Sequence, residues 1–171
     1  MLLLLNQSAM ADRFTVTEAS VERQQELYLL NATIKYELSD ELVEALKSGI
    51  TIPFKVLIEV YTPRRFLPDS EIAFLKQRYE LQYHALSRQY IVTNHNSSVS
   101  ESFGSLHHAL THLGQINDLP MIDHDLLEAD TKYRLRIRAA INTSRLSMPL
   151  RLPSYFYGPW SSESTWWDMP L

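Results

Sequence analysis

Cysteine is absent from the 171-residue sequence, and glycine is scarce, with only four residues. The absence of cysteine excludes thiol catalysis, a disulfide scaffold and zinc sites built from cysteine. With so few glycines, the sequence contains no Gly-x-Ser-x-Gly nucleophile turn and no glycine loop that could cradle a phosphate. These absences remove frequent signatures of enzymes, and we predict a protein that is not an enzyme and that uses no cofactor.

Long apolar runs and excess basic charge are also lacking. No stretch approaches the roughly 20 consecutive apolar residues that a membrane-spanning helix needs. Lys and Arg together number 16 against 20 Asp and Glu, which gives a formal net charge of −4. Because nucleic-acid binding depends on a basic surface that contacts phosphates, nucleic acid is not an expected partner. The length and the 45% apolar content are ordinary for one folded domain with its own core.

The first eleven residues have features of an export signal. An apolar run, Leu2 to Leu5, is followed by Ala9-Met10-Ala11 and then by Asp12. An Ala-x-Ala triplet at this place is typical of a signal-peptidase cleavage site. The run is short and no positively charged segment precedes it. We interpret residues 1–11 as a signal peptide, with a strand-forming or disordered N-terminus as the alternative.

Two-residue alternation of apolar and polar side chains dominates the rest of the chain. It predicts strands with one buried face over residues 14–17, 28–38, 50–61, 75–85, 90–93, 99–103 and 132–142. At the centre, Arg78 to Tyr90 reads as a strand, a turn at Ser87 and Arg88, and a return strand. Gln77 interrupts the apolar row there, which predicts a position near the margin of the sheet.

Two short helices interrupt the strands. Ser39 and Ser105 are predicted to cap their N-termini, and Gly49 and Gly114 to end them. Residues 115–130 read as a polar, acid-rich connection with at most one short turn of helix. The sum is mainly β: an antiparallel β-sandwich, immunoglobulin-like, of about seven strands over residues 12–143. A barrel is the nearest alternative. Residues 144–171, rich in proline and aromatics, are predicted to form a strap packed on the same domain.

Several segments carry a resemblance to one family. They are Pro63-Arg64-Arg65-Phe66, the run Tyr83-His84-Ala85-Leu86-Ser87-Arg88, Leu119-Pro120, Leu150-Arg151-Leu152-Pro153 and Trp167-Asp168-Met169-Pro170-Leu171. In these the chain resembles a proteobacterial family catalogued as domain of unknown function 4390. The resemblance implies export to the periplasm and, through neighbouring genes for a membrane sensor kinase, a signalling or envelope role. It implies no catalytic residue, and the leader here is shorter than the family's.

Candidate binding residues lie in three places. Lys132, Arg134, Arg136 and Arg138 form a row of cations on one strand face, roughly 7 Å apart. Such a row either pairs with acids on neighbouring strands or binds an anionic partner. The expected binding residues are Arg134, Arg136, Arg138, Arg64, Arg65, Trp160, Trp166 and Trp167. The tryptophans belong to the tail, where Tyr155, Phe156 and Tyr157 add to a strap or to an exposed docking segment.

Three other groups favour ordinary surface roles. His108 and His112, with His107 adjacent, have a spacing that could chelate zinc, but no third ligand is near in sequence, so no metal is expected. Asp123, Asp125, Glu128 and Asp130 lack the glycine and spacing of a calcium loop. His84 and Ser87 have no orienting acid for nucleophilic catalysis.

The sequence therefore predicts a periplasmic, non-enzymatic module that binds another envelope protein, with the periplasmic domain of a sensor kinase as the candidate. The alternative is an envelope factor with peripheral membrane contact, which binds anionic lipid or cell-wall polymer through the arginine face and aromatic tail.

Overall fold

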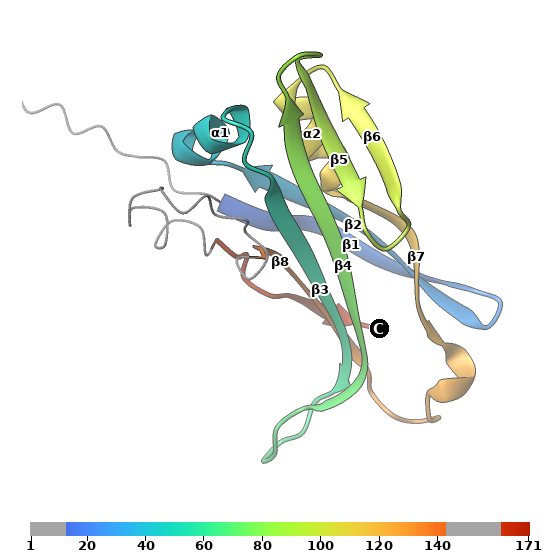
Figure 1. Cartoon of the computed structure of the whole chain (residues 1–171). Helices are drawn as coiled ribbons and strands as arrows, with labels where there is room; N and C mark the ends of the chain where they lie inside the picture. Colours follow the sequence, from blue (N-terminus) through green and yellow to red (C-terminus); the bar gives the residue numbers. More distant parts are fainter. Residues whose placement is uncertain (1–12, 143–161) are drawn as a thin grey trace, which may run out of the picture.

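The strands of the protein form two antiparallel sheets, seen in a computed structural model that describes residues 13–142 and 162–171 (Figure 1). The smaller sheet has the order β1-β2-β7, with β1 (Arg13–Gln24), β2 (Leu27–Glu37) and β7 (Gln115–Asp123). The larger sheet has the order β6-β5-β4-β3-β8-β9, with β6 (Val99–Phe103), β5 (Gln89–Asn94), β4 (Ser70–His84), β3 (Ile52–Thr62), β8 (Arg134–Ile141) and β9 (Trp167–Pro170).

The core lies between the inner faces of the two sheets. Strand β3 contributes a row of fully buried residues on alternate positions: Ile52, Phe54, Val56, Ile58 and Val60. Phe54 contacts Tyr36 of β2 and Phe14 of β1, with ring centroids 5.2 and 5.9 Å apart. Because each large apolar side chain contributes about 1.5–3 kcal/mol when fully buried, this row anchors the larger sheet on the smaller one.

Helix α1 (Asp40–Lys47) follows β2 and is bounded as the sequence predicts. The Ser39 Oγ accepts a hydrogen bond from the Leu42 backbone N–H at 3.4 Å, which supplies a partner to one of the unpaired donors of the first turn. Gly49 follows the helix with a φ of +91°, a conformation that glycine adopts without steric cost.

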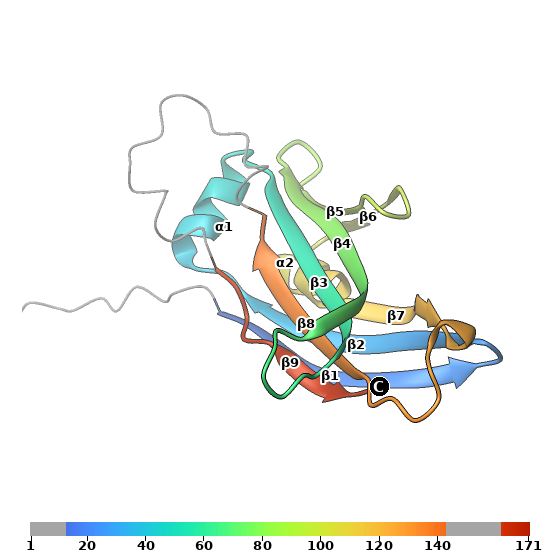
Figure 2. The same cartoon turned by 90° about the horizontal axis from the view of Figure 1, so that it is seen from below.

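Helix α2 (Leu106–Leu113) lies between β2 of the smaller sheet and β5 and β6 of the larger one (Figure 2). Its buried residues are Ala109 and Leu113. The Ser105 Oγ accepts from the His108 backbone N–H at 3.2 Å, so this predicted cap is also confirmed. At the other terminus, the Ile34 backbone N–H donates to the Gly114 carbonyl oxygen at 2.8 Å. That bond fixes the position where the chain leaves α2 and enters β7.

The predicted class, mainly β with two antiparallel sheets and two inserted helices, is confirmed, and it is consistent with a sandwich. The immunoglobulin-like subtype is not confirmed by this topology. The central hairpin is confirmed: β4 pairs with β5 up to His84 and Gln89, and Arg88 in the turn has a φ of +55°. The described residues form nine strands, where about seven are predicted.

The predicted connection over residues 115–130 is wrong in its first half, which is strand β7. The strand has buried Ile116, Met121 and Ile122, but two register shifts against β2 interrupt its alternation. Asp118, with a φ of +48°, lies within the irregular region. The following 3₁₀ turn η1 (His124–Leu126) is the single short helical turn that the sequence predicts.

Two further expectations need correction. The first strand is predicted over residues 14–17, yet β1 continues to Gln24, because a bulge between Val16 and Glu18 shifts the alternation. Gln77 does not mark a margin. It lies in the middle of β4, paired with Val56 of β3, and the strand begins seven residues earlier at Ser70.

Residues 162–171 run along β8, and β9 within them is the outermost strand of the larger sheet (Figure 2). The Ser164 backbone N–H donates to the Ala139 carbonyl at 2.8 Å, and β9 continues the pairing as far as Arg134 and Pro170. The remainder of the predicted strap, including Trp160, lies outside the described residues. No helix within residues 13–142 and 162–171 combines the length and apolar character that a membrane span requires.

Candidate functional site

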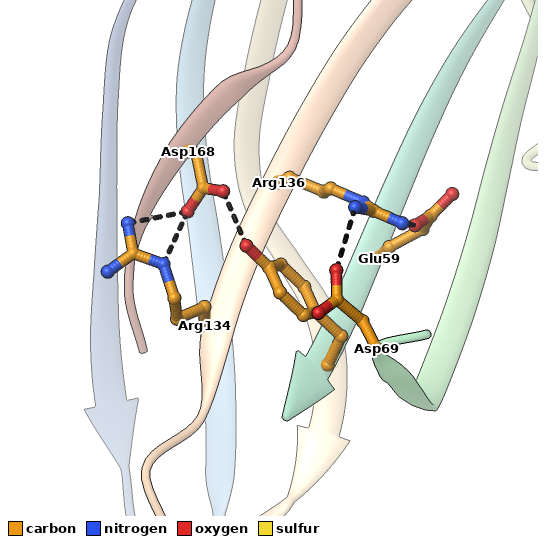
Figure 3. A network of polar contacts seen from close by, with 6 residues as sticks. Glu59, Asp69, Arg134, Arg136 and Asp168 are labelled. Atoms are coloured by element: carbon orange, nitrogen blue, oxygen red, sulfur yellow. Dashed lines mark hydrogen bonds and ion pairs between the residues drawn. The ribbon is translucent and has the colours of Figure 1, made fainter. Parts of the chain in front are cut away.

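The arginine row of β8 lies on the outer face of the larger sheet, among acids from neighbouring strands (Figure 3). Arg134 donates from Nε and Nη2 to the same Asp168 oxygen, both at 2.7 Å. The Tyr61 hydroxyl donates to the other oxygen of Asp168 at 2.5 Å. Burial, followed by this hydrogen bond to Asp168, raises the pKa of Tyr61, and the hydrogen bond with Asp168 raises the pKa of Arg134.

Arg136 has the most contacts of the three arginines. Its Nε and Nη2 donate to one oxygen of Glu59 at 2.6 and 2.5 Å, and its Nη1 lies 3.5 Å from Asp69 (Figure 3). The guanidinium also lies over the ring of Tyr61 at 4.6 Å and over that of Trp166 at 5.0 Å. Arg136 therefore links β3, the loop after it, and the tail.

Arg138 completes the row. Its Nη1 lies 3.3 Å from Glu163, and its guanidinium lies 4.5 Å from the Trp166 ring. The three guanidinium groups thus face four carboxylates: Glu59, Asp69, Glu163 and Asp168. The expected pairing with acids of neighbouring strands is confirmed. This pairing leaves little uncompensated positive charge on the outer face. Binding of an anionic partner by these arginines stays a prediction.

The loop between β3 and β4, residues 63–69, presents the other two predicted arginines; we call it the hairpin tip. Within the described residues, Arg64 and Arg65 form no ion pair, and the Arg65 guanidinium lies 5.3 Å from the ring of Phe66. Phe66 and Leu67 are 87% and 65% exposed. Two cations without an ion-pair partner in the described residues are thus followed directly by two largely exposed apolar side chains.

A cavity of about 540 Å³ lies beside the hairpin tip; we call it the end pocket. Its lining includes Pro63 of the tip, Tyr28 of β2 and Glu128 and Lys132 of the connection between β7 and β8. The Tyr28 hydroxyl lies 3.3 Å from His124 Nδ1 on its wall. The volume is within the range of ligand-binding pockets, and the wall combines apolar groups with charges of both signs.

The acidic residues predicted as a solvated connection lie at this same end of the molecule. Asp123 caps η1, because its side chain accepts a hydrogen bond from the Asp125 backbone N–H at 3.0 Å. Glu128 lines the end pocket. The end that carries the hairpin tip is therefore mixed in charge.

A second cavity, of about 290 Å³, lies between the sheets next to α2; we call it the inter-sheet pocket. Gln77 and Tyr79 of β4 line it, and each is only 8% exposed. Burial raises the pKa of the Tyr79 phenol. Sequence analysis missed this site, although the one available signal was Gln77, a polar residue in an otherwise apolar row.

The remaining candidates lie apart from these pockets or at their rims. His112 lies 3.3 Å from Glu101, and the His107 and His108 rings are neighbours at 5.8 Å. In the described ranges, no group of three or more potential ligands could hold a metal ion. His84 Nδ1 lies 2.9 Å from the Ser87 hydroxyl in an exposed turn. Trp167 is exposed on β9.

Comparison with known proteins gives one family. No curated protein and no solved structure matches the chain. The model of the family described as a domain of unknown function, DUF4390, matches residues 11–170. Because this match spans nearly the whole chain, the protein belongs to the DUF4390 family.

Proposed function

We propose that this protein is an exported, non-enzymatic binding module of the cell envelope, which docks another protein through the hairpin tip and the adjacent end pocket. The observation that carries the proposal is the tip itself, with Phe66 87% exposed beside two arginines that have no ion-pair partner within the described residues. Aromatic residues and arginine are enriched at protein interfaces, and Arg is prominent among the residues that dominate binding energy.

The chemistry of the tip defines the partner. Arg64 and Arg65 require carboxylates, and Phe66 and Leu67 require an apolar recess. In turn, the end pocket can accept an apolar side chain from the partner beside Pro63. We therefore expect a folded partner that presents acidic groups around an apolar cleft. The resemblance described from sequence implies export and neighbouring genes for a membrane sensor kinase. The periplasmic domain of such a kinase is therefore the first candidate partner.

Binding to an anionic membrane is the second candidate function, since exposed Phe66 and Leu67 beside arginines also suit a lipid surface. Each cation near such a surface contributes about 1 kcal/mol. However, the connection that follows β7 lies at the same end of the molecule as the tip (Figure 1). The end of β7 and this connection carry four acids that an anionic surface would repel: Asp123, Asp125, Glu128 and Asp130. A partner protein of mixed charge suits this surface better than a uniformly anionic one.

A photocrosslinking residue at position 66, introduced into the full chain in intact cells, tests the proposal. We expect a discrete crosslinked product identified by mass spectrometry as an envelope protein. Leu86 provides the matched control, because it is 94% exposed and lies in the turn at the opposite end of β4. Crosslinks of equal yield at both positions would contradict a specific site.

Purified variants separate the two candidate functions. Binding of each purified variant to the partner identified by crosslinking is then measured. The double variant Arg64→Glu/Arg65→Glu should bind this partner at least tenfold more weakly than the wild type, whereas Leu86→Ser should bind it equally well. Sedimentation with lipid vesicles, with and without anionic phosphatidylglycerol, tests the second candidate function, membrane binding. Salt-sensitive sedimentation with the anionic vesicles, lost in the arginine variant, would overturn protein docking in favour of membrane contact.

A further inference from the structure

The inter-sheet pocket is lined by two largely buried residues whose polar groups have no hydrogen-bond partner within the described residues. Gln77 and Tyr79 are both more than nine-tenths buried and line this cavity. Neither side chain forms a hydrogen bond with another described residue. Their polar atoms are also not among the fully buried side-chain atoms that lack a partner, so they are accessible from the cavity, where water or a ligand can satisfy them.

Gln77 is a polar residue at a position of β4 that faces the core. On β4 it lies between Leu75 and Tyr79 on the inner face, at a place where Val56 of β3 is its neighbour. An apolar residue there would continue the core. The glutamine instead directs an amide, with both donor and acceptor atoms, into the space bounded by α2 and β7.

The wall supplies further hydrogen-bonding groups. The Asn94 Oδ1 accepts from the backbone N–H groups of Asn96 and Ser97 at 2.8 and 3.2 Å. The Asn94 side-chain N–H₂ forms no hydrogen bond with another described residue, and Asn94 lines the cavity. Glu101 and His112, 3.3 Å apart, lie on the wall with half-exposed side chains. The pocket therefore opens to solvent at this pair.

The charges and apolar groups of the wall narrow the class of ligand. Among the described residues, no Lys or Arg lines this cavity, and the one carboxylate on its wall is that of Glu101, 3.3 Å from His112, so the wall does not favour an anion. The polar groups of the wall include both hydrogen-bond donors and acceptors. A hydroxyl is a small neutral group that can both donate and accept a hydrogen bond. The apolar part of the wall, made of Val92, Val99, Ile116 and Leu119, can pack against C–H groups.

We infer that the inter-sheet pocket binds a neutral, polyhydroxylated ligand of the size of a single sugar, held by Gln77, Tyr79 and Asn94. A cavity of about 290 Å³ with several polar partners is large enough for water to occupy its polar positions in the free protein. Sugar hydroxyls then replace these waters without loss of hydrogen bonds. The inference is independent of the docking surface at the hairpin tip, because the two sites share no residue.

Titration of the ¹⁵N-labelled full chain with glucose, galactose and N-acetylglucosamine at millimolar concentrations tests this inference. For at least one sugar, we expect chemical-shift changes confined to the backbone of β4 and β7 around the pocket and to the side-chain amides of Gln77 and Asn94. Gln77→Leu should raise the Kd at least tenfold. Gln82→Leu is the matched control, since Gln82 lies on the same strand but is exposed, and it should leave the Kd unchanged.

Tyr79→Phe, which removes only a hydroxyl, provides a second variant if Gln77→Leu does not fold, and it should weaken sugar binding while the spectrum stays native. The inference is overturned if no sugar causes shifts, if the shifts lie elsewhere, or if neither variant weakens binding. Stabilisation by Gln77→Leu without sugar binding to the wild type would show that the cavity holds water alone.

Discussion

Tyr36 is the residue at which the core departs furthest from full hydrogen bonding. Its ring lies between Phe14 and Phe54, at centroid distances of 5.1 and 5.2 Å, and its buried hydroxyl has no partner among the described residues. Tyr36→Phe should therefore raise the free energy of unfolding by about 1 kcal/mol, measured by urea denaturation. Tyr79→Phe, whose hydroxyl lines a cavity, is the control and should change stability less. A lower stability of the Tyr36 variant would show that the hydroxyl has a partner.

The same substitution changes the response to alkaline pH. Burial, with a smaller effect of Tyr79, raises the pKa of Tyr36 above that of an unfolded tyrosine. Between those two values the folded state keeps the proton that the unfolded state releases, so stability is full below about pH 10 and falls above it. The loss is at most about 1.4 kcal/mol per pH unit for one tyrosine. Tyr36→Phe should flatten this decline in denaturation series from pH 9 upward.

At the scale of elements, Gly114 joins α2 and β7 to β2. A Cβ at this position would lie 1.9 Å from the Ile34 carbonyl oxygen, which is backbone and belongs to a buried strand. Gly114→Ala should destabilise the protein by about 2 kcal/mol or more, seen as a lower midpoint in urea. Gly104→Ala is the matched control, because a Cβ there has no neighbour within 4 Å. Equal stability of the two variants would contradict the close approach.

The elements that could be predicted from sequence are those whose pattern is local. Side-chain alternation identifies β2, β3 and β8, and Ser39 and Ser105 identify the starts of both helices. Strand β7 could not be found this way, because two register shifts and Pro120 break its period. The partners of Arg136 depend on strand order and register, which place Glu59 beside it from 77 residues away. The inter-sheet pocket depends on the same long-range pairing, because its lining comes from several strands and α2. In the sequence its one signal is Gln77, a polar residue in an apolar row.

At the scale of the whole molecule, the polar network on the outer face fastens the tail to the body. Asp168 accepts from Arg134 and Tyr61, which lie on two different strands. Asp168→Asn should therefore loosen β9, and we expect cleavage near the tail in limited proteolysis to become several-fold faster. Glu163→Gln is the control, because its single contact to Arg138 is longer, at 3.3 Å, and exposed pairs contribute little. Equal cleavage of both variants would leave Asp168 without this role.

The position of β9 also bears on self-association. Strand β8 is largely buried and apolar, with Leu135, Ile137 and Ile141 inside, and β9 occupies the edge that it would otherwise present to solvent. With β9 in place, the larger sheet ends on strands of only five and four residues, β6 and β9. Short edges are poor templates for strand addition by another molecule. Strand β9 thus protects the protein against aggregation. A protein without β9 would expose the eight-residue strand β8 as an edge that can pair with a strand of another molecule.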